Sequence, residues 1–129
     1  MSRFVFDAST LLVSINREHG FEAVDAIVDA DDVVISSVNV AEVITKLALR
    51  GSADGDIAAA LGVYRLTVAP FHEVSATAVG LLVRRTRHRG LSLADRACLA
   101  LAMELRLPVV TADRAWAELD LGIDIRLIR

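Results

Sequence analysis

The sequence predicts an α/β fold in which a mostly parallel, five-stranded sheet lies between two layers of helices. Short apolar runs, typical of buried strands, alternate along the chain with longer segments whose apolar residues recur at helical spacing. Helical segments of this length supply the right-handed crossovers that parallel strands require. Because the chain has 129 residues, we expect one domain that spans residues 1–129.

The first half of the chain contains three of the expected strands. Gly20 and Gly51 each follow a helical pattern, and glycine is the residue that most often ends a helix. In the third helix, which starts near Asn39, apolar residues from Val40 to Ala48 keep the spacing of one buried face. In order, we expect a strand at 3–6, helices at 8–19 and 21–29, a strand at 33–35, helices at 39–50 and 54–64, and a strand at 66–69.

The second half of the chain adds two strands. Residues 73–89 predict one long helix whose apolar first half leads into a run of arginines and which Gly90 ends. Ser92 is a suitable N-cap for a helix that runs to Leu105, and apolar residues on both sides of this helix indicate that it is central. The remaining elements are a strand at 109–111, a short helix at 115–119 and a final strand at 123–128.

The composition is rich in apolar residues but does not predict a membrane protein. Hydrophobic residues make up 54% of the chain and the mean hydropathy is +0.50. The longest stretch without a charged residue, 74–83, is far shorter than the roughly 20 residues that cross a bilayer. We assign the excess to a buried helix and an apolar subunit interface. No signal-peptide pattern is seen, and Cys98 fits a helical core, so we expect a cytoplasmic protein without disulfides.

Positive charge is concentrated in one segment, although the net charge is −3. Of the 14 basic residues, 13 are arginine, and an arginine cluster beside His88 contains Arg84, Arg85, Arg87 and Arg89. The planar guanidinium group donates two hydrogen bonds to a phosphate at once, so this arginine cluster suits a nucleic-acid backbone. The alternative is the solvated end of a helix, where cations interact favourably with the helix dipole. The sequence leaves both interpretations open.

Four acidic residues are spaced so that a parallel sheet would bring them together: Asp7, Glu42, Asp95 and Asp113. Asp7 and Asp113 follow predicted strands, and the other two lie in predicted first turns of helices. The carboxyl ends of parallel strands share one edge of a sheet, which is where such folds bind ligands. Like charges gathered there would repel by about 3 to 4 kcal/mol per close pair, so a hard divalent cation with oxygen ligands is the natural counterion.

Each of the four acids also has a local explanation that needs no ligand. A carboxylate beside a helix start can accept a hydrogen bond from a free backbone N–H, and one beside a lysine can form an ion pair. The candidate partners are the helix starts that follow Asp7 and Asp113, Ser92 in a capping box with Asp95, and Asn39 or Lys46 for Glu42. Any one of the acids could be structural, but the convergence of all four favours a site.

Four segments of the chain resemble the PIN domain, and in detail the VapC-type toxin ribonucleases of bacterial toxin–antitoxin pairs. They are FVFDASTLL, SSVNVAEVITKL, GLSLADRACLALA and PVVTADRAWAEL, and the resemblance covers essentially the full length. It implies a PIN-like three-layer α/β/α fold with five parallel strands. It also makes the four acids, Asp7, Glu42, Asp95 and Asp113, the metal-binding and catalytic quartet of the family, with the hydroxyl groups of Ser9 and Thr111 beside it.

The resemblance implies a metal-dependent endoribonuclease that cleaves cellular RNA, transfer or ribosomal, with a water activated by Mg²⁺ or Mn²⁺. It further implies a homodimer and a cognate VapB-type antitoxin. The arginine cluster would then grip the RNA backbone, while Arg96 and Arg114, each next to an acid of the quartet, would balance its charge. Two other functions stay open: a non-catalytic acidic pocket that binds a basic peptide, and a metal-dependent phosphatase for a small ester.

Overall fold

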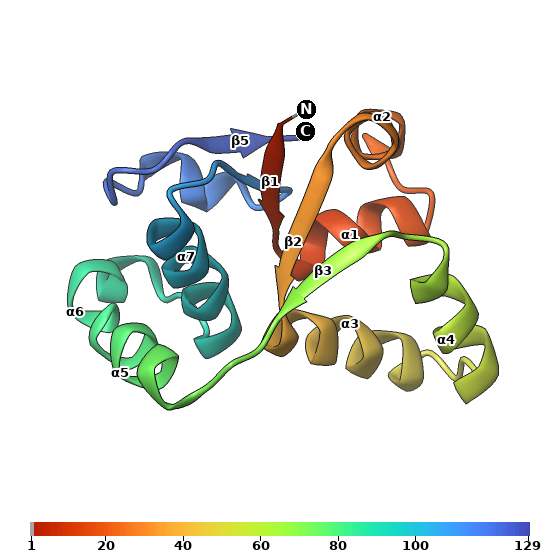
Figure 1. Cartoon of the computed structure of the whole chain (residues 1–129), viewed down its shortest axis with the longest axis horizontal. Helices are drawn as coiled ribbons and strands as arrows, with labels where there is room; N and C mark the ends of the chain where they lie inside the picture. The colour runs from red at the N-terminus through yellow and green to blue at the C-terminus, as the bar shows by residue number, and fades with distance from the viewer. Residues whose placement is uncertain (1) are drawn as a thin grey trace.

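The computed structural model describes residues 2–129 and contains a parallel sheet of five strands (Figure 1). The strand order is β3-β2-β1-β4-β5, and each neighbouring pair is parallel. The strands are β1 (Arg3–Phe6), β2 (Asp32–Ser36), β3 (Leu66–Ala69), β4 (Val109–Thr111) and β5 (Ile125–Leu127). The predicted α/β class with a five-stranded parallel sheet is confirmed.

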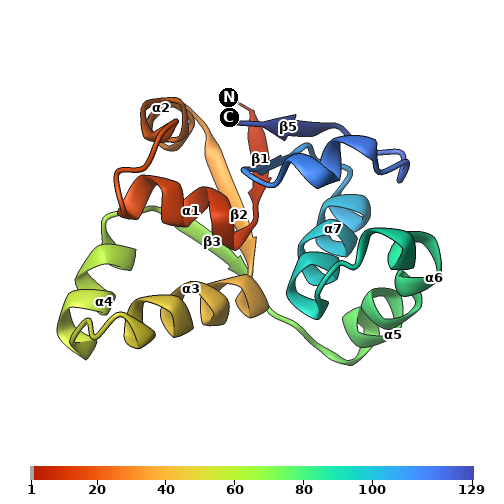
Figure 2. The same ribbon diagram turned by 180° about the vertical axis from the view of Figure 1, so that it is seen from behind.

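Helices connect the strands and cover both faces of the sheet. They are α1 (Ala8–Ile15), α2 (Phe21–Ala30), α3 (Ser37–Leu49), α4 (Asp54–Gly62), α5 (Glu73–Leu81), α6 (Val83–Thr86) and α7 (Leu93–Leu105), with the 3-10 helices η1 (Arg87–Arg89) and η2 (Arg114–Glu118). α1 and α2 lie on one face, and α7 lies on the other with α5 against it (Figure 1, Figure 2). α3 contacts both α1 and α7, so it joins the two layers.

Strand residues alternate between the two faces of the sheet, as the two-residue period of a strand requires. Val5, Val34 and Val109 pack in one apolar cluster with Leu99 of α7. Their neighbours along the strands pack in two other clusters with α1 and α2: Phe4, Phe6, Val33, Ile35 and Val110. Because β1, β2 and β4 are buried on both faces, their sequences are mostly continuous apolar runs, whereas the edge strands β3 and β5 are partly exposed. This packing confirms the three-layer α/β/α arrangement.

The central strand β1 marks the point at which the strand order reverses. The chain places β2 and β3 on one side of β1 and later places β4 and β5 on the other side. Connections therefore leave the carboxyl ends of β1 and β4 in opposite directions, which opens a crevice between them. Asp7 directly follows β1, and Asp113 lies two residues beyond the end of β4. The topology alone thus brings these two acids to the same edge of the sheet.

The first helix is shorter than predicted, and Gly20 has a different role. The helix predicted at 8–19 ends at Ile15, because Arg17 adopts a left-handed conformation with φ of 54° and turns the chain. Gly20, with φ of 97°, precedes α2 and does not end α1. A Cβ atom on Gly20 would lie 3.0 Å from the carbonyl oxygen of Ile128, so close packing also favours glycine there.

The third helix begins two residues earlier than predicted. Ser36 is its N-cap, and the Ser36 Oγ accepts a hydrogen bond from the Val38 N–H at 3.2 Å, so the helix starts at Ser37 and not near Asn39. Glu42 consequently lies in the second turn of α3, where it cannot act as the third residue of a capping box. The predicted capping box between Asn39 and Glu42 is therefore wrong.

The single long helix predicted at 73–89 is also wrong, because the chain forms α5, α6 and η1 instead. Arg96 of α7 donates hydrogen bonds to the carbonyl groups of Val79 and Gly80 at 3.0 and 3.3 Å. The Arg96 side chain thus donates to the last carbonyl groups of α5 and stabilises the end of the helix there. Gly80 also lowers the stability of this part of the helix. Toward the C-terminus, the predicted short helix is the 3-10 helix η2, and the last strand is shorter than expected.

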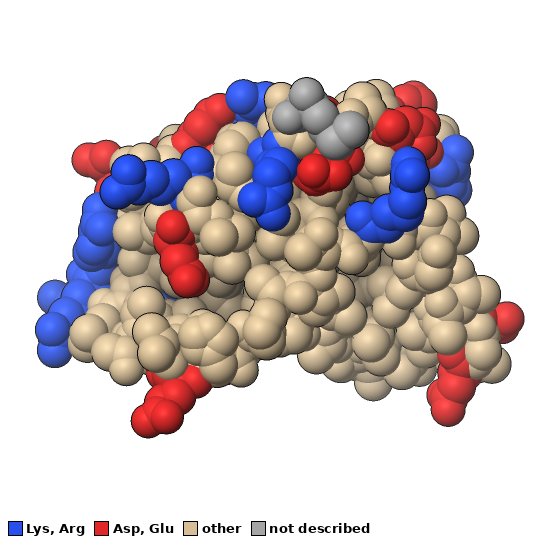
Figure 3. Space-filling view, in the orientation of Figure 1, with Lys and Arg blue, Asp and Glu red and all other residues tan. Residues whose placement is uncertain are grey.

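One face of the molecule carries a broad area without charged side chains. Figure 3 shows this face in the orientation of Figure 1, with Lys and Arg gathered toward its edges. β3 and the start of α5 cross the same face in Figure 1, and they expose 47% of Val68 and 76% of Val74. Part of the apolar excess of the sequence therefore lies on this surface. No helix within residues 2–129 is long and apolar enough to cross a membrane.

Replacing Leu99 with alanine should lower the free energy of unfolding by about 2 to 5 kcal/mol, because the truncation leaves a cavity. Leu99 is fully buried between α7 and the sheet. Leu93→Ala is the matched control on the same helix, since Leu93 is 55% exposed, and it should change the free energy by less than about 0.5 kcal/mol. Urea denaturation measures both variants. Equal losses would contradict the assignment of α7 as a core helix.

Candidate functional site

A buried carboxylate, Asp7, lies at the crevice where β1 ends and α1 begins; the residue is 4% exposed. Its Oδ1 accepts hydrogen bonds from the N–H and the hydroxyl of Thr10, both at 2.9 Å. Its Oδ2 accepts one from the Thr111 hydroxyl at 2.7 Å, and the Ser9 Oγ lies 2.8 and 2.9 Å from the two carboxylate oxygens. The two hydroxyl groups expected beside the acids, those of Ser9 and Thr111, therefore both contact Asp7.

The surroundings of Asp7 disfavour its charged form. Burial raises the pKa of the Asp7 carboxyl, and the hydrogen bonds from Thr111, Thr10 and Ser9 lower it only in part. Within residues 2–129, no lysine, arginine or histidine forms an ion pair with this carboxylate. A buried carboxylate without a paired cation is costly, so this position favours the binding of a cation.

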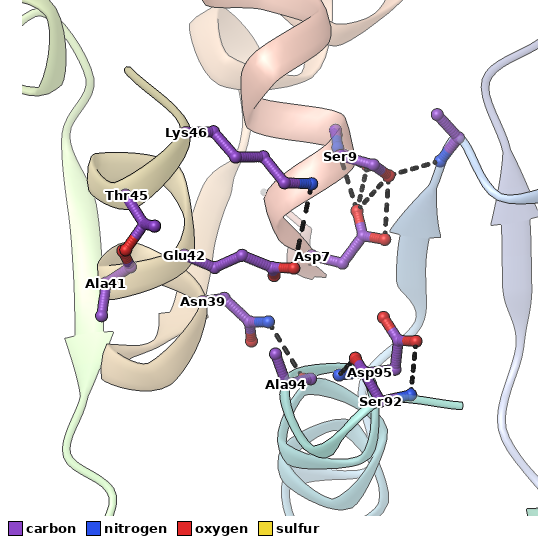
Figure 4. Close-up of polar contacts among 12 residues, drawn as sticks. Asp7, Ser9, Asn39, Ala41, Glu42, Thr45, Lys46, Ser92, Ala94 and Asp95 are labelled. Carbon is purple, nitrogen blue, oxygen red and sulfur yellow. Dashed lines mark hydrogen bonds and ion pairs between the residues drawn. The ribbon is translucent and has the colours of Figure 1, made fainter. Parts of the chain in front are cut away.

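Two further carboxylates, from α3 and α7, approach the same crevice (Figure 4). Burial raises the pKa of Glu42, Lys46 at 3.9 Å lowers it, and the negative charges of Asp95 and Asp7 raise it again. The buried Cys98 thiol lies within reach of the same three charges. Its pKa is raised well above the usual value by burial and then by Asp7, Asp95 and Glu42. Three of the four predicted acids therefore share an acidic pocket, a name used below for Asp7, Glu42 and Asp95.

Asp113 is joined to the acidic pocket through a hydroxyl group. The Thr111 hydroxyl, which donates to Asp7, accepts a hydrogen bond from the Asp113 N–H at 3.0 Å. The Asp113 Oδ1 accepts one from the Ala115 N–H at 3.0 Å and so caps η2, and the residue is exposed. The structure thus places the Asp113 backbone beside the pocket and its carboxylate at the surface.

Three of the four acids also cap a helix, as their local explanations predicted. Asp7 and Asp113 accept hydrogen bonds from backbone N–H groups at the starts of α1 and η2. Asp95 forms a reciprocal capping box with Ser92, with distances of 3.0 and 3.1 Å. Glu42 caps no helix start. An acid can cap a helix and also belong to the pocket. The capping hydrogen bond fixes the backbone of that residue, and this in turn fixes where its carboxylate lies.

The donor set of the pocket fits a hard divalent cation, because it offers carboxylate oxygens that repel one another when ionised. Among the residues that the structure describes, however, no three His, Cys, Asp or Glu side chains form a ready-made metal-ligand cluster. Asp95 turns its Oδ2 to the Ser92 N–H, and Glu42 faces Lys46. A cation would have to compete with these contacts. The metal site formed by all four acids stays a prediction.

Within residues 2–129, Arg96 and Arg114 form no ion pair with an acid of the quartet, and their charge-balancing role stays a prediction. Arg96 donates to carbonyl groups at the end of α5, and the Arg114 Nε donates to the Arg129 carbonyl at 3.3 Å. The hydrogen bonds of both side chains therefore go to backbone carbonyl groups, and the buried Arg96 Nε has no partner in the described part of the chain. Arg96 directly follows Asp95 in α7, but successive side chains of an α-helix point about 100° apart, so the two side chains extend in different directions. Among the described residues, Lys46 is the cation that contacts the pocket, through its ion pair with Glu42.

The arginine cluster is divided between internal contacts and solvent. The Arg85 Nη2 donates to a backbone carbonyl that follows η2, at 3.1 Å, and Arg89 forms an ion pair with Glu118 of η2. These two arginines tie α6 and η1 to the segment around η2. In the described part of the chain, Arg84 and Arg87 are exposed and make no side-chain hydrogen bond or ion pair. Two of the four arginines are therefore free to contact another molecule.

Two polar residues that were not predicted as site residues complete the surroundings of the pocket. Thr10 is fully buried, and its hydroxyl lies 2.9 Å from Asp7 and 2.7 Å from the Val110 carbonyl of β4. Asn39 is 1% exposed and donates to the Ala94 carbonyl of α7 at 3.0 Å. The spacing of Thr10, three residues after Asp7, was a usable signal because it is the reach of an N-cap. No local pattern marked Asn39 as a link to α7.

Replacing Asp7 with asparagine should make the stability of the metal-free protein less sensitive to rising pH. An unfolded aspartate loses its proton near pH 3.9, whereas folded Asp7 keeps it to a higher pH. Through that window the folded chain binds the extra proton, so the Asp7 contribution to the free energy of unfolding falls as pH rises. Chemical denaturation in EDTA at a series of pH values measures the effect.

The control for this pH series is Asp120→Asn, which removes an exposed loop carboxylate. This exposed substitution should change the free energy of unfolding at neutral pH by less than about 0.5 kcal/mol. An Asp7→Asn profile of unfolding free energy against pH that is parallel to that of the wild type would contradict the raised pKa of Asp7.

Comparisons with known proteins agree with the fold. The PIN domain family model matches residues 4–121. A similar solved structure is the DNA-bound VapBC of Salmonella typhimurium, with a TM-score of 0.76 and 22% identity over 100% of both chains. Another is VapC20 of Mycobacterium tuberculosis, described as a sarcin-ricin loop cleaving toxin, with a TM-score of 0.75 and 17% identity over 95% of this chain and 99% of that one. VapBC2 of Rickettsia felis, bound to a promoter DNA fragment, has a TM-score of 0.72 and 15% identity over 95% and 96%.

These solved structures are less than 25% identical to this chain, so they establish the fold alone. A comparison with curated proteins found no match. The family model spans the sequence from β1 to the loop after η2 and includes all four acids. The chain therefore belongs to the PIN domain family.

Proposed function

We propose that this protein is a metal-dependent endoribonuclease that acts in the cytoplasm as the toxin of a VapBC-type toxin–antitoxin pair. The observation that carries the proposal is the acidic pocket at the switch point of the sheet, where Asp7, Glu42 and Asp95 influence one another. Three carboxylates with one lysine beside them suit a divalent cation and, through it, a phosphodiester substrate.

In this mechanism the four acids would hold one or two Mg²⁺ or Mn²⁺ ions, partly through water: Asp7, Glu42, Asp95 and Asp113. When bound, the metal would polarise the scissile phosphate and lower the pKa of the attacking water. Asp7 is held firmly, because four donor groups contact its two oxygens. A carboxylate that orients the attacking water is sufficient as a base, so the mechanism needs no histidine.

The similar solved structures support the toxin and partner assignments. VapC20 is described as a sarcin-ricin loop cleaving toxin, and two other similar structures are VapBC assemblies with DNA. We infer that this chain likewise pairs with a VapB-type antitoxin and forms a homodimer. Transfer or ribosomal RNA is the proposed substrate, and the exposed part of the arginine cluster would contact its phosphates.

Purified, antitoxin-free protein should cut cellular RNA into discrete fragments in Mn²⁺ or Mg²⁺ and leave it intact in EDTA. Asp95→Asn should abolish cleavage because it removes a carboxylate from the pocket. The asparagine oxygen can still accept the Ser92 N–H, so the capping box and the fold should be kept. Gel electrophoresis with end mapping of the fragments measures the cleavage.

Glu104→Gln is the matched control for this assay, because it removes the same charge at the other end of α7. It should keep full activity. Wild-type activity in Asp95→Asn would overturn the role of the acidic pocket. Intact RNA in every lane, with Mn²⁺ binding still measurable, would favour the binding module for a basic peptide or the phosphatase, which a chromogenic phosphoester then separates.

Arg84 and Arg87 should contribute more to RNA binding than Arg85 and Arg89, because the second pair is held by internal contacts. Each phosphate contact that is lost reduces the slope of log affinity against log salt by about 0.7 to 0.9. The double variant Arg84→Ala/Arg87→Ala should therefore flatten the slope by about 1.4 to 1.8. Arg85→Ala/Arg89→Ala should change it by less than about half as much.

The arginine variants are best compared in the Asp95→Asn background, in which RNA should bind without being cut. Filter binding or fluorescence anisotropy at several salt concentrations gives the slopes. If neither double variant changes the slope, the arginine cluster is the solvated helix end of the alternative interpretation.

A further inference from the structure

Asn39 links the two helices that carry Glu42 and Asp95. It is 1% exposed on the first turn of α3, and its Nδ2 donates to the Ala94 carbonyl on the first turn of α7 at 3.0 Å. Ala94 directly precedes Asp95, so this hydrogen bond fixes the backbone from which the Asp95 side chain extends. In Figure 4, Asn39 lies between Glu42 and this turn of α7.

The same amide also acts on the Glu42 carboxylate. A hydrogen bond from the Asn39 side chain lowers the pKa of Glu42, against the effects of burial and of the neighbouring negative charges. An amide NH₂ group has two protons. The bond that the geometry shows goes to the Ala94 carbonyl, so the side chain holds the backbone beside Asp95 while it lies near the Glu42 carboxylate (Figure 4).

The Asn39 amide is held in this orientation although one of its atoms is left without a partner. Its Oδ1 is buried and accepts no hydrogen bond within residues 2–129. A buried acceptor without a donor is unfavourable and uncommon in folded proteins. The hydrogen bond to Ala94 therefore decides the orientation of the side chain, and its acceptor directly precedes Asp95.

We propose that Asn39 is a positioning residue that sets the separation of Glu42 and Asp95 for a divalent cation. This inference rests on the proposed function, because it assumes that the acidic pocket binds the metal. Glu42 and Asp95 repel each other and lie on different helices, so their repulsion acts against the packing of α3 on α7. The amide bridges the two helices at the level of the carboxylates and opposes that movement.

Mn²⁺ binding to the purified full chain tests the proposal without any dependence on cleavage. Isothermal titration calorimetry gives the affinity, and electron paramagnetic resonance of Mn²⁺ reports its surroundings. Asn39→Ala should weaken Mn²⁺ binding by about 10- to 100-fold, as the loss of groups that orient metal ligands commonly does. It should also change the Mn²⁺ spectrum, because the link between the first turns of α3 and α7 beside Glu42 and Asp95 is lost.

Leu47→Ala is the control for a general loosening of α3. Leu47 is buried two turns further along the same helix face and packs in the core. This variant should lose at least as much thermal stability as Asn39→Ala and keep Mn²⁺ affinity within about twofold of the wild type. If Leu47→Ala weakens Mn²⁺ binding as much as Asn39→Ala does, Asn39 has only a structural role and the proposal is overturned.

A second comparison tests whether Asn39 acts through Glu42. In a Glu42→Gln background, adding Asn39→Ala should weaken Mn²⁺ binding by less than about threefold, because one of the two carboxylates whose separation Asn39 sets is already absent. If Asn39→Ala lowers Mn²⁺ affinity in this background as much as it does in the wild type, Asn39 does not act through Glu42. Should Asn39→Ala fail to unfold cooperatively, Asn39→Leu fills a similar volume without donors and is measured in its place.

The outcomes separate this inference from the function on which it rests. If the wild type binds Mn²⁺ and Asn39→Ala binds it equally well, the role of Asn39 is overturned and the metal-dependent nuclease stands. If the wild type binds no Mn²⁺ while Asp7 and Glu42 are ionised, the metal site is overturned and the inference falls with it.

Discussion

The fold buries a carboxylate, Asp7, at the switch point of its sheet, and residues 2–129 supply no cation that forms an ion pair with it. Donors from Ser9, Thr10 and Thr111 hold both carboxylate oxygens, and the N-terminus of α1 also favours a negative charge there. These contacts offset the desolvation of Asp7 only in part, since its pKa stays raised. A bound cation would offset the remaining free-energy cost of burying the charged Asp7 carboxylate. The other residues of the site lie around Asp7.

The helical layers hold further negative charges beside this carboxylate. α3 contacts both α1 and α7, and in doing so it brings Glu42 toward Asp7 and Asp95. The apolar clusters on the two faces of the sheet stabilise an arrangement that the charges themselves disfavour. Such a conflict between local charge and global packing is typical of a functional site, where proteins give up some stability for activity.

No arginine within residues 2–129 forms an ion pair with Asp7, Glu42 or Asp95. Arg96 and Arg114 donate to backbone carbonyls, although each follows an acid of the predicted quartet in the sequence. Within the arginine cluster, the internal contacts of Arg85 and Arg89 fix the segment that leads into α7. An acidic pocket with one lysine beside it and an exposed pair of arginines on the same chain would suit a metal ion and a polyanionic substrate together.

The sequence by itself determined the layers, the strands and the capped helix of Asp95. The strands at 3–6, 66–69 and 109–111 have the predicted bounds, because a buried run and its turn residues are local patterns. The tertiary structure decided the break after α5 and the link made by Asn39. Arg96 reaches a carbonyl 17 residues away, and Asn39 reaches one 55 residues away. Those acceptors come within reach only after α5, α3 and α7 have packed together, and no local pattern of residue types records which distant backbone group a polar side chain will meet.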